Sequence, residues 1–195
     1  MRKGCIERVT GETNIKIKTC IEGNGIFTGT SGIGFFDHML ELFAKHSGCD
    51  LDVEASGDIH VDYHHLVEDL GICIGKSIKE ALADKKGIKR YGMSYVPMDE
   101  ALIRVVVDFS GRPYLAYRVH DIKDRVGVFD TELVEEFLRA LTLNGGITIH
   151  VDKISGHNTH HIIEGIFKAL ARSMSAGWQL DANPDSVLST KGILE

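Results

Sequence analysis

One motif occurs twice in this chain of 195 residues, and the repetition restricts its fold more than any other feature. Residues 63–69 read YHHLVED and residues 159–165 read THHIIEG, so in both places two adjacent histidines precede two apolar residues and a glutamate. The two copies stand 96 residues apart, and each opens a stretch with the apolar period of a helix. Matching segments at a fixed spacing indicate a duplicated structural unit.

A second pair of segments extends the repeat. MLELFAKHSGCDLDV (39–53) and FLRALTLNGGITIHV (137–151) lie 98 residues apart, and each predicts a short amphipathic helix, a glycine stop and a strand. The difference of two residues between the spacings falls in predicted loops, where length changes are tolerated. We therefore expect an α+β fold with an internal duplication, in which residues 1–92 and 93–195 are two similar half-repeats of one compact unit.

Three other segments give further predictions. Residues 94–119 predict a strand hairpin that turns at SGRP (110–113). His60 and His150 alternate with apolar residues, so we expect both on strands, in structural or outward-facing positions. GICIGKS (71–77) resembles a phosphate-binding loop, but only three residues separate its glycines and it lies within a predicted helix. This segment therefore disfavours a nucleotide-binding protein.

The composition disfavours several classes of protein. The net charge of -6 argues against nucleic acid as the main partner, because a phosphate backbone needs a basic surface. The apolar runs, such as VVV (105–107) within IRVVV, are too short to span a membrane. The four cysteines lie far apart without a C-x-x-C pair, and the first residues show no apolar signal segment. These features favour a cytoplasmic protein with reduced thiols and no thiolate zinc site.

The repeated motif has the geometry of a metal site if it lies on a helix. Residues i and i+4 share a helix face, so the first histidine of each doublet points with the glutamate, while the second histidine points elsewhere. We expect the two doublets to exchange the second histidine, which yields two metal ions related by the duplication. The resulting sets are His65 with His160 and Glu164, and His161 with His64 and Glu68.

The 98-residue spacing adds a candidate ligand to each site. It aligns His38 in FFDHML with Glu136 in LVEEF, and both residues open the first helix of their half. Nitrogen and carboxylate donors without thiolate suit Mn, Fe or Zn, and octahedral geometry with open positions would favour Mn. A single HHxxE motif is more often a surface feature or a satisfied core histidine. The second copy favours metal binding, because polar clusters in apolar helices are costly to keep.

Six segments of the chain, including both motifs, match one known pattern. They read RVTGETNI, GIGFFDHMLELFAKHSGCDLDV, HVDYHHLVEDLGICIGKSI, SGRPYL, HNTHHIIEGIFKALARSM and STKGIL. Together they resemble the imidazoleglycerol-phosphate dehydratase family over nearly the whole chain. The resemblance implies a ribosomal S5 domain 2-like fold, with a roughly four-stranded mixed sheet and two helices in each half and the helices packed between the sheets. It also implies a homo-oligomer, a 24-subunit octahedral shell with active sites at subunit interfaces.

The resemblance also implies an activity. It is that of a hydro-lyase of L-histidine biosynthesis, which converts D-erythro-imidazole glycerol phosphate to imidazole acetol phosphate with two Mn²⁺ per active site. If both ring nitrogens of the substrate bind metal ions, the ring can become an imidazolate, expel hydroxide and pass through a diazafulvene-like intermediate. The implied ligands are His38, His65, His160 and Glu164 for one ion, and His64, Glu68 and His161 for the other. Some members have histidine where this chain has Glu136, so the part of Glu136 in the second set stays open.

Further residues gain roles only through the resemblance. Glu12 in TGETNI is the implied substrate contact and general acid/base, although by itself it is typical of a surface glutamate at a strand end. Lys168 follows Glu164 by four residues, which independently assigns it to the helix face of the metal pair. The implied phosphate-binding residues are Arg90, Arg112, Lys168, Ser189 and Lys191.

Two other functions fit a two-metal site when the resemblance is set aside. A two-metal hydrolase would activate water against esters or amides and would need no imidazole. A non-catalytic metal-binding shell protein would bind metal and assemble without turnover. An assay of Mn-loaded protein with imidazole glycerol phosphate distinguishes the three, because only the dehydratase forms an enolisable ketone that can be followed by absorbance.

Overall fold

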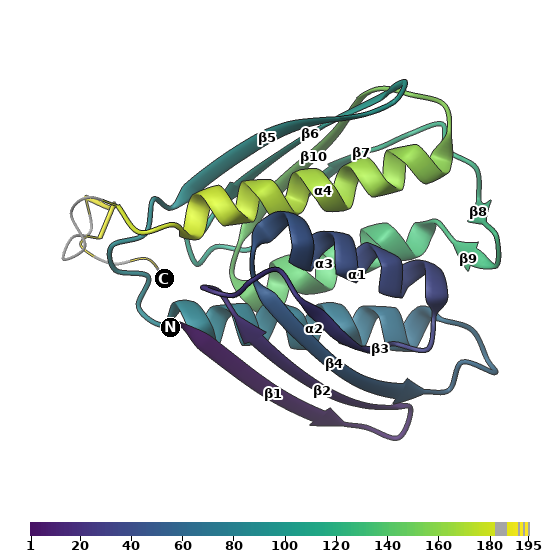
Figure 1. The fold of residues 1–195 in the computed structure, drawn as a ribbon, viewed down its shortest axis with the longest axis horizontal. Helices are drawn as coiled ribbons and strands as arrows, with labels where there is room; N and C mark the ends of the chain where they lie inside the picture. The colour runs from purple at the N-terminus through teal and green to yellow at the C-terminus, as the bar shows by residue number, and fades with distance from the viewer. Residues whose placement is uncertain (182–186, 191, 193, 195) are drawn as a thin grey trace.

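The computed structural model describes residues 1–181, 187–190, 192 and 194, which form four helices and ten strands (Figure 1). The strands are β1 (Lys3–Val9), β2 (Thr13–Cys20), β3 (Phe27–Thr30), β4 (Asp50–Gly57), β5 (Tyr91–Met98), β6 (Ala101–Asp108), β7 (Tyr114–Arg118), β8 (Arg125–Val126), β9 (Phe129–Asp130) and β10 (Thr148–Ser155). The helices are α1 (Gly34–Ser47), α2 (His64–Leu82), α3 (Glu132–Gly145) and α4 (Thr159–Trp178). Each half runs through three strands, a helix, a strand and a helix, and the second half adds the short hairpin β8–β9.

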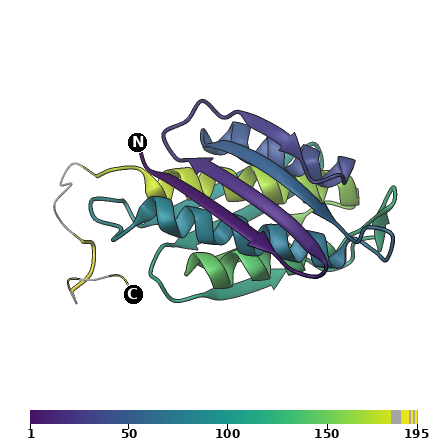
Figure 2. The same ribbon diagram turned by 90° about the horizontal axis from the view of Figure 1, so that it is seen from below.

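The two halves form four-stranded sheets of the same topology. The strand order is β1-β2-β4-β3 in the first sheet and β5-β6-β10-β7 in the second, and one parallel pair closes each sheet. The helices lie between the sheets, with α2 against the first sheet and α4 against the second (Figures 1 and 2). The predicted α+β duplication, with helices packed between two mixed sheets, is confirmed.

Equivalent residues of the two halves follow three spacings. The hairpins β1–β2 and β5–β6 have matching registers, with Val9 opposite Asn14 and Pro97 opposite Leu102, so they stand 88 residues apart. Helices α1 and α3 stand 98 residues apart, and the histidine doublets 96. The step from 88 to 98 arises in residues 119–131, where the second half inserts β8–β9. The 88-residue spacing was not predicted from the sequence, because the two hairpins share few identical residues.

Both halves contribute to a single core. In β6 every second residue from Ala101 to Val107 is buried, as strand alternation requires. The helices pair across the halves, since α2 packs on α3 and α1 packs on α4. At the centre, the ring centroids of Phe36 and Phe137 lie 5.1 Å apart, and those of Phe137 and Phe167 lie 5.6 Å apart. These aromatic contacts join α1, α3 and α4 in one apolar layer.

Two glycines of α2 account for the segment that resembles a phosphate loop. A Cβ atom on Gly71 would lie 2.6 Å from the carbonyl oxygen of Phe137, and one on Gly75 would lie 2.7 Å from that of Leu141. The absence of side chains at these positions lets the backbones of α2 and α3 approach closely. The segment lies inside a helix, as predicted, and its glycines serve helix packing.

The hairpin predicted within residues 94–119 is wrong. β6 and β7 are not neighbours, because β10 lies between them, antiparallel to β6 and parallel to β7. The hairpin of this region instead joins β5 to β6 through the two-residue turn Asp99-Glu100. His60 lies in a turn and not on the predicted strand, whereas His150 lies on β10 as predicted. A local pattern shows strands, but it cannot show that a later strand inserts between two of them.

All four helices of the described part run in the same direction, so their N-termini gather at one end of the molecule (Figure 1). We name this end the histidine end, because it holds His38, His64, His65, His160 and His161. The opposite end, where α2 and α4 finish and β5 begins, is named the arginine end after Arg90 and Arg112. Within the described residues, no helix is both long and apolar enough to cross a membrane.

Candidate active site

Glu164 in the second turn of α4 is the centre of the histidine end. Its Oε1 lies 3.1 Å from Nε2 of His38 and 3.1 Å from Nε2 of His160, and its Oε2 accepts a hydrogen bond from Nζ of Lys168 at 2.6 Å. Burial by itself would raise the pKa of Glu164, but the hydrogen bonds from Lys168, His38 and His160 outweigh it and lower the pKa to about 2. Glu164 is therefore an ionised carboxylate on which two imidazoles from different helices converge.

The equivalent pair on α2 is more open. Nε2 of His64 lies 3.7 Å from Oε2 of Glu68, and both side chains are half-buried. The predicted i, i+4 geometry is thus confirmed for both motifs. Glu136 lies in α3, where its carboxylate is 3.8 Å from Nε of Arg139. A half-buried glutamate at this distance from an arginine of its own helix keeps lone pairs for another partner.

His65, the second histidine of the first doublet, lies between two carboxylates. Its Nδ1 is 2.9 Å from Oδ2 of Asp58, which follows β4, and its Nε2 is 3.8 Å from Oε1 of Glu12, in the β1–β2 turn. The hydrogen bond with Asp58 raises the pKa of His65 and lowers that of Asp58. Glu12 is exposed and stands beside a predicted metal ligand, as an acid/base group near the reacting atoms would.

His161, the second histidine of the other doublet, has a parallel arrangement. Its Nδ1 is 2.8 Å from Oε2 of Glu100 and its Nε2 is 3.8 Å from Oδ2 of Asp99, both in the β5–β6 turn. The hydrogen bond from His161, followed by that from the Asn158 N–H, lowers the pKa of Glu100 to about 2. Sequence reasoning missed Asp58, Asp99 and Glu100. The 88-residue spacing, which aligns Glu12 with Glu100, is the signal that could have found Glu100.

The donors at the histidine end suit a divalent cation such as Mn²⁺, since they are imidazole nitrogens and carboxylate oxygens. Among the described residues, however, no group of three or more such side chains has the geometry of a metal site within one copy. His38, His160 and Glu164 come together as a hydrogen-bonded cluster. The four-residue ligand sets, and the exchange of the second histidines between them, stay predictions.

The arginine end brings together three of the predicted phosphate-binding residues. Arg90, Arg112 and Ser189 line an open hollow of about 380 Å³ with Leu188 and Thr190. The Arg90 guanidinium makes two hydrogen bonds to Asp108, at 2.7 and 3.1 Å, and donates a third to the Leu188 carbonyl oxygen at 2.6 Å. Lys168 lies elsewhere, beside Glu164, and Lys191 lies outside the described residues.

The arginine end and the histidine end are far apart in one copy. The N–H of Arg90 donates to the carbonyl oxygen of Gly177 at 2.8 Å, so Arg90 lies at the last turn of α4. His161 lies in the first turn of the same helix. The sixteen residues from His161 to Gly177 correspond to about 24 Å of helix.

Comparison with known proteins decides the family. The chain matches the family model described as imidazoleglycerol-phosphate dehydratase over residues 31–174. A curated relative of that name from Moorella thermoacetica is 54% identical over 193 residues, which cover 99% of this chain and 98% of the relative. Another, from Acetivibrio thermocellus, is 52% identical over 193 residues, with 99% of both chains covered. The chain belongs to the imidazoleglycerol-phosphate dehydratase family.

Solved structures of the imidazoleglycerol-phosphate dehydratase family share the fold. The Staphylococcus aureus structure has a TM-score of 0.84 and 45% identity, and it covers 92% of this chain and 99% of its own. The Pyrococcus furiosus structure has a TM-score of 0.82 and 36% identity, with 97% and 100% covered. The family model spans the predicted ligands from His38 to Glu164, and the longer alignments include Glu12. Membership makes the chain a hydro-lyase (EC 4.2.1.19).

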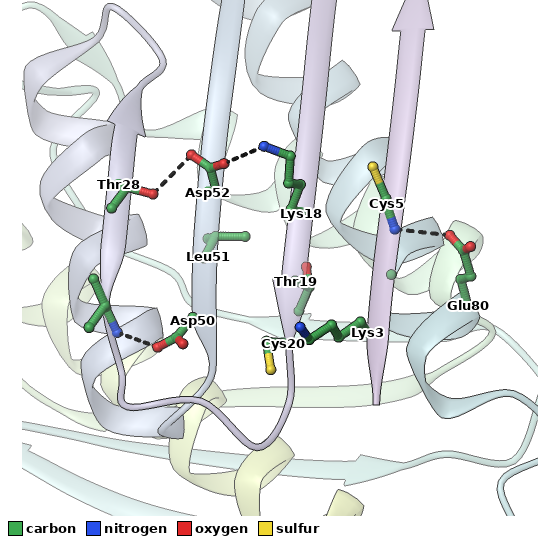
Figure 3. Close-up of a pocket in the computed structure, with 12 residues that line it drawn as sticks. Lys3, Cys5, Lys18, Thr19, Cys20, Thr28, Asp50, Leu51, Asp52 and Glu80 are labelled. Carbon is green, nitrogen blue, oxygen red and sulfur yellow. Dashed lines mark hydrogen bonds and ion pairs between the residues drawn. The ribbon is translucent and has the colours of Figure 1, made fainter. Parts of the chain in front are cut away.

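Another hollow of this imidazoleglycerol-phosphate dehydratase family member, about 470 Å³, lies away from both ends. It lies on the outer face of the first sheet, and no predicted ligand is among its described lining residues (Figure 3). Its carboxylates already have partners, since Asp52 accepts hydrogen bonds from Lys18 and Thr28, both at 2.9 Å, Glu80 accepts one from the Cys5 N–H at 3.1 Å, and Asp50 accepts one from the Ile26 N–H at 3.0 Å. The convergence of imidazoles and carboxylates at the histidine end, and not cavity volume, identifies the candidate site.

Proposed function

We propose that the chain removes water from D-erythro-imidazole glycerol phosphate to give imidazole acetol phosphate in L-histidine biosynthesis, with two Mn²⁺ per active site. The observation that carries the proposal is the histidine end, where two imidazoles converge on the ionised Glu164 and Glu12 stands beside His65. Family membership supports the substrate and replaces the two alternatives considered from the sequence, a two-metal hydrolase and a non-catalytic shell. The cytoplasmic location stays a prediction.

Each metal ion is proposed to take the first histidine and the glutamate of one doublet and the second histidine of the other. His38 would join one set, and Glu136 has a carboxylate available for the other. Because the described residues assemble neither set within one copy, we propose that the exchanged histidine comes from a neighbouring copy. The sets are His38, His65, His160 and Glu164 for one ion, and His64, Glu68, His161 and Glu136 for the other.

Glu12 is the proposed proton carrier. When bound, the two ions would polarise the substrate's imidazole, which would favour loss of the hydroxyl from the carbon beside the ring and of a proton from the next carbon. The Glu12 N–H donates to Oγ1 of Thr10 at 3.1 Å, and the Glu12 carbonyl oxygen accepts from the Asp58 N–H at 3.1 Å. The carboxylate thus extends from a backbone that is held on both sides, so it can receive a proton at carbon and return it. The imidazolate and diazafulvene-like route stays a prediction.

The arginine end is the proposed phosphate site. Arg112 is exposed beside the hollow that Arg90 and Ser189 also line, so cations and a hydroxyl face one space. Arg90 is already committed to Asp108, and this pairing orients its guanidinium toward the hollow's rim. Lys168 acts first on Glu164 through its 2.6 Å hydrogen bond, and its contact with phosphate stays a prediction, as does that of Lys191.

A composite active site follows from the separation of the two ends. A three-carbon chain joins imidazole to phosphate in the substrate, and it cannot bridge the approximately 24 Å that helix α4 imposes between His161 and Arg90 within one copy. We propose that the histidine end of one copy faces the arginine end of another. This arrangement supports a homo-oligomer with active sites at subunit interfaces, of which the 24-subunit octahedral shell is the proposed form.

Mixing two inactive variants tests this proposal. Glu12→Gln disables the histidine end and Arg112→Ala disables the arginine end, so each homo-oligomer should lose turnover of imidazole glycerol phosphate. If the two residues act from different copies, co-expressed mixed oligomers at equal amounts should regain about a quarter of the wild-type rate. If both residues act from the same copy, every active site carries a defect and no activity returns. That second outcome would overturn the composite site.

A further inference from the structure

The second histidine of each doublet is held at Nδ1 by a carboxylate from outside its own helix. Nδ1 of His65 lies 2.9 Å from Oδ2 of Asp58, and Nδ1 of His161 lies 2.8 Å from Oε2 of Glu100. Asp58 follows the last residue of β4, whereas Glu100 lies in the β5–β6 turn. Two unrelated positions in the duplicated fold therefore make the same contact, which a duplication alone does not produce.

The contact determines which ring nitrogen can act as a ligand. A carboxylate only accepts hydrogen bonds, so Nδ1 must carry the hydrogen and Nε2 keeps its lone pair. In both rings Nε2 lies 3.8 Å from a carboxylate oxygen, of Glu12 or Asp99, which is beyond hydrogen-bond distance. Nε2 of His161 also lies 3.3 Å from Nδ2 of Asn158, an amide nitrogen that can only donate to its lone pair. We propose that Asp58 and Glu100 are positioning residues that fix Nε2 as the metal-binding nitrogen of His65 and His161. This inference rests on the proposed metal sites.

The remaining oxygens of the two carboxylates have different surroundings. Oε1 of Glu100 accepts the backbone N–H of His157 at 3.2 Å and of Asn158 at 2.8 Å, just before α4 begins. Oδ1 of Asp58 is buried and has no hydrogen-bond partner among the described residues. The same chemical change, from carboxylate to carboxamide, must therefore act differently at the two positions.

In Glu100→Gln, the amide oxygen has to stay with the two backbone N–H groups, because turning the amide would point its NH₂ at two donors. Its NH₂ then faces Nδ1 of His161, which must accept, and the hydrogen moves to Nε2. In Asp58→Asn, the amide oxygen can keep the Nδ1–H of His65 while the NH₂ takes the place of the unpartnered Oδ1. The first change removes a ligand lone pair, and the second keeps it.

The test measures Mn²⁺ binding to the metal-free full-length oligomer, with free Mn²⁺ followed by electron paramagnetic resonance. Glu100→Gln should weaken one of the two sites per chain by about 10–100-fold, the usual effect of losing a ligand's outer partner, with an unchanged melting temperature. Asp58→Ala should weaken the other site by a similar factor. Asp58→Asn should bind within about threefold of wild type, because it keeps the Nδ1 contact. The matched control is Glu54→Gln, an exposed carboxylate on β4, which should bind Mn²⁺ as wild type does.

Two results would overturn the inference. One is wild-type Mn²⁺ affinity in Glu100→Gln, because the carboxylate then does not set the ligand nitrogen. The other is equal weakening in Asp58→Asn and Asp58→Ala, since the Nδ1–H acceptor would then be irrelevant. The proposed function fails separately: a wild-type protein without two Mn²⁺ sites per chain would remove the metal centre itself, whatever the variants do.

Discussion

The two halves contain the same hairpin turn, and each half uses its glutamate differently. Glu12 and Glu100 are equivalent by strand register, and each lies beside the second histidine of a doublet. Glu100 accepts hydrogen bonds from Nδ1 of His161 and from two backbone N–H groups. In the first half Asp58 contacts Nδ1 of His65 instead, and the Glu12 carboxylate is exposed. The same turn therefore holds one glutamate against its histidine and leaves the other exposed.

The helices that join the halves show a second difference. In α2, Gly71 and Gly75 let the backbone approach α3, while the residues 96 positions later in α4 are Phe167 and Ala171. Phe167 packs against Phe36 of α1 at 6.1 Å between ring centroids. Helices α2 and α3 therefore lie close together because Gly71 and Gly75 have no side chains, whereas an aromatic ring lies between α1 and α4.

The largest expected effect tests the difference between the two glutamates. Glu12→Gln removes the proposed proton carrier but no predicted ligand, so turnover should fall by about 10²–10⁴-fold while the Mn content stays at the wild-type value. Steady-state kinetics on Mn-loaded protein, with metal analysis of the same sample, provide the measurement. A rate within threefold of wild type would exclude Glu12 as the acid/base group. Glu12 would then have a structural role only, like Glu100.

An intermediate effect tests the helix pairs. Gly75→Ala should lower the free energy of unfolding by about 1–3 kcal/mol, because its Cβ meets the backbone of α3 and neither helix can shift alone. Thermal or denaturant unfolding measures it. Gly34→Ala is the control, since a Cβ there meets nothing within 4 Å. Equal stability of the two variants would show that α2 and α3 have room to separate.

The smallest expected effect is on the free energy of unfolding, and it compares equivalent carboxylates on the outer faces of the two sheets. Asp152 on β10 is buried between Arg104 and Arg118, at 2.9 and 2.6 Å, whereas its equivalent in the first half, Glu54, is exposed. Burial by itself would raise the pKa of Asp152, but the hydrogen bonds from the two arginines outweigh it and lower that pKa.

A lowered folded-state pKa gives stability that is present above the unfolded value of about 4 and is lost as pH falls through the folded value. Asp152→Asn should therefore cost about 1–2 kcal/mol at pH 7, and the deficit should shrink below about pH 4. Glu54→Gln should change stability by less than about 0.5 kcal/mol at either pH. Unfolding curves at several pH values measure both. A deficit in Asp152→Asn that does not depend on pH would contradict the ionic origin.

The sequence predicted the duplicated fold better than it predicted the residues of the candidate active site. The repeated HHxxE motif and the 98-residue spacing predicted the duplicated fold, because both follow from local periodicity. Pairing of β10 between β6 and β7 was missed, since it joins strands far apart in the chain. Asp58 and Glu100 were missed because a single carboxylate in a turn looks like a surface residue until its histidine is known. The distance between the histidine end and the arginine end could not be predicted from the sequence either, because it depends on the direction in which α4 runs.

The common direction of the four helices has an electrostatic consequence. Each helix carries about half a positive charge at its N-terminus from aligned peptide dipoles, and these charges point into the histidine end. That field would repel a divalent cation. Glu164, Glu100 and Asp58, all acidic groups with lowered pKa values, stand at the same end. The carboxylates thus do more than hold imidazoles, because their negative charges also oppose the positive helix termini.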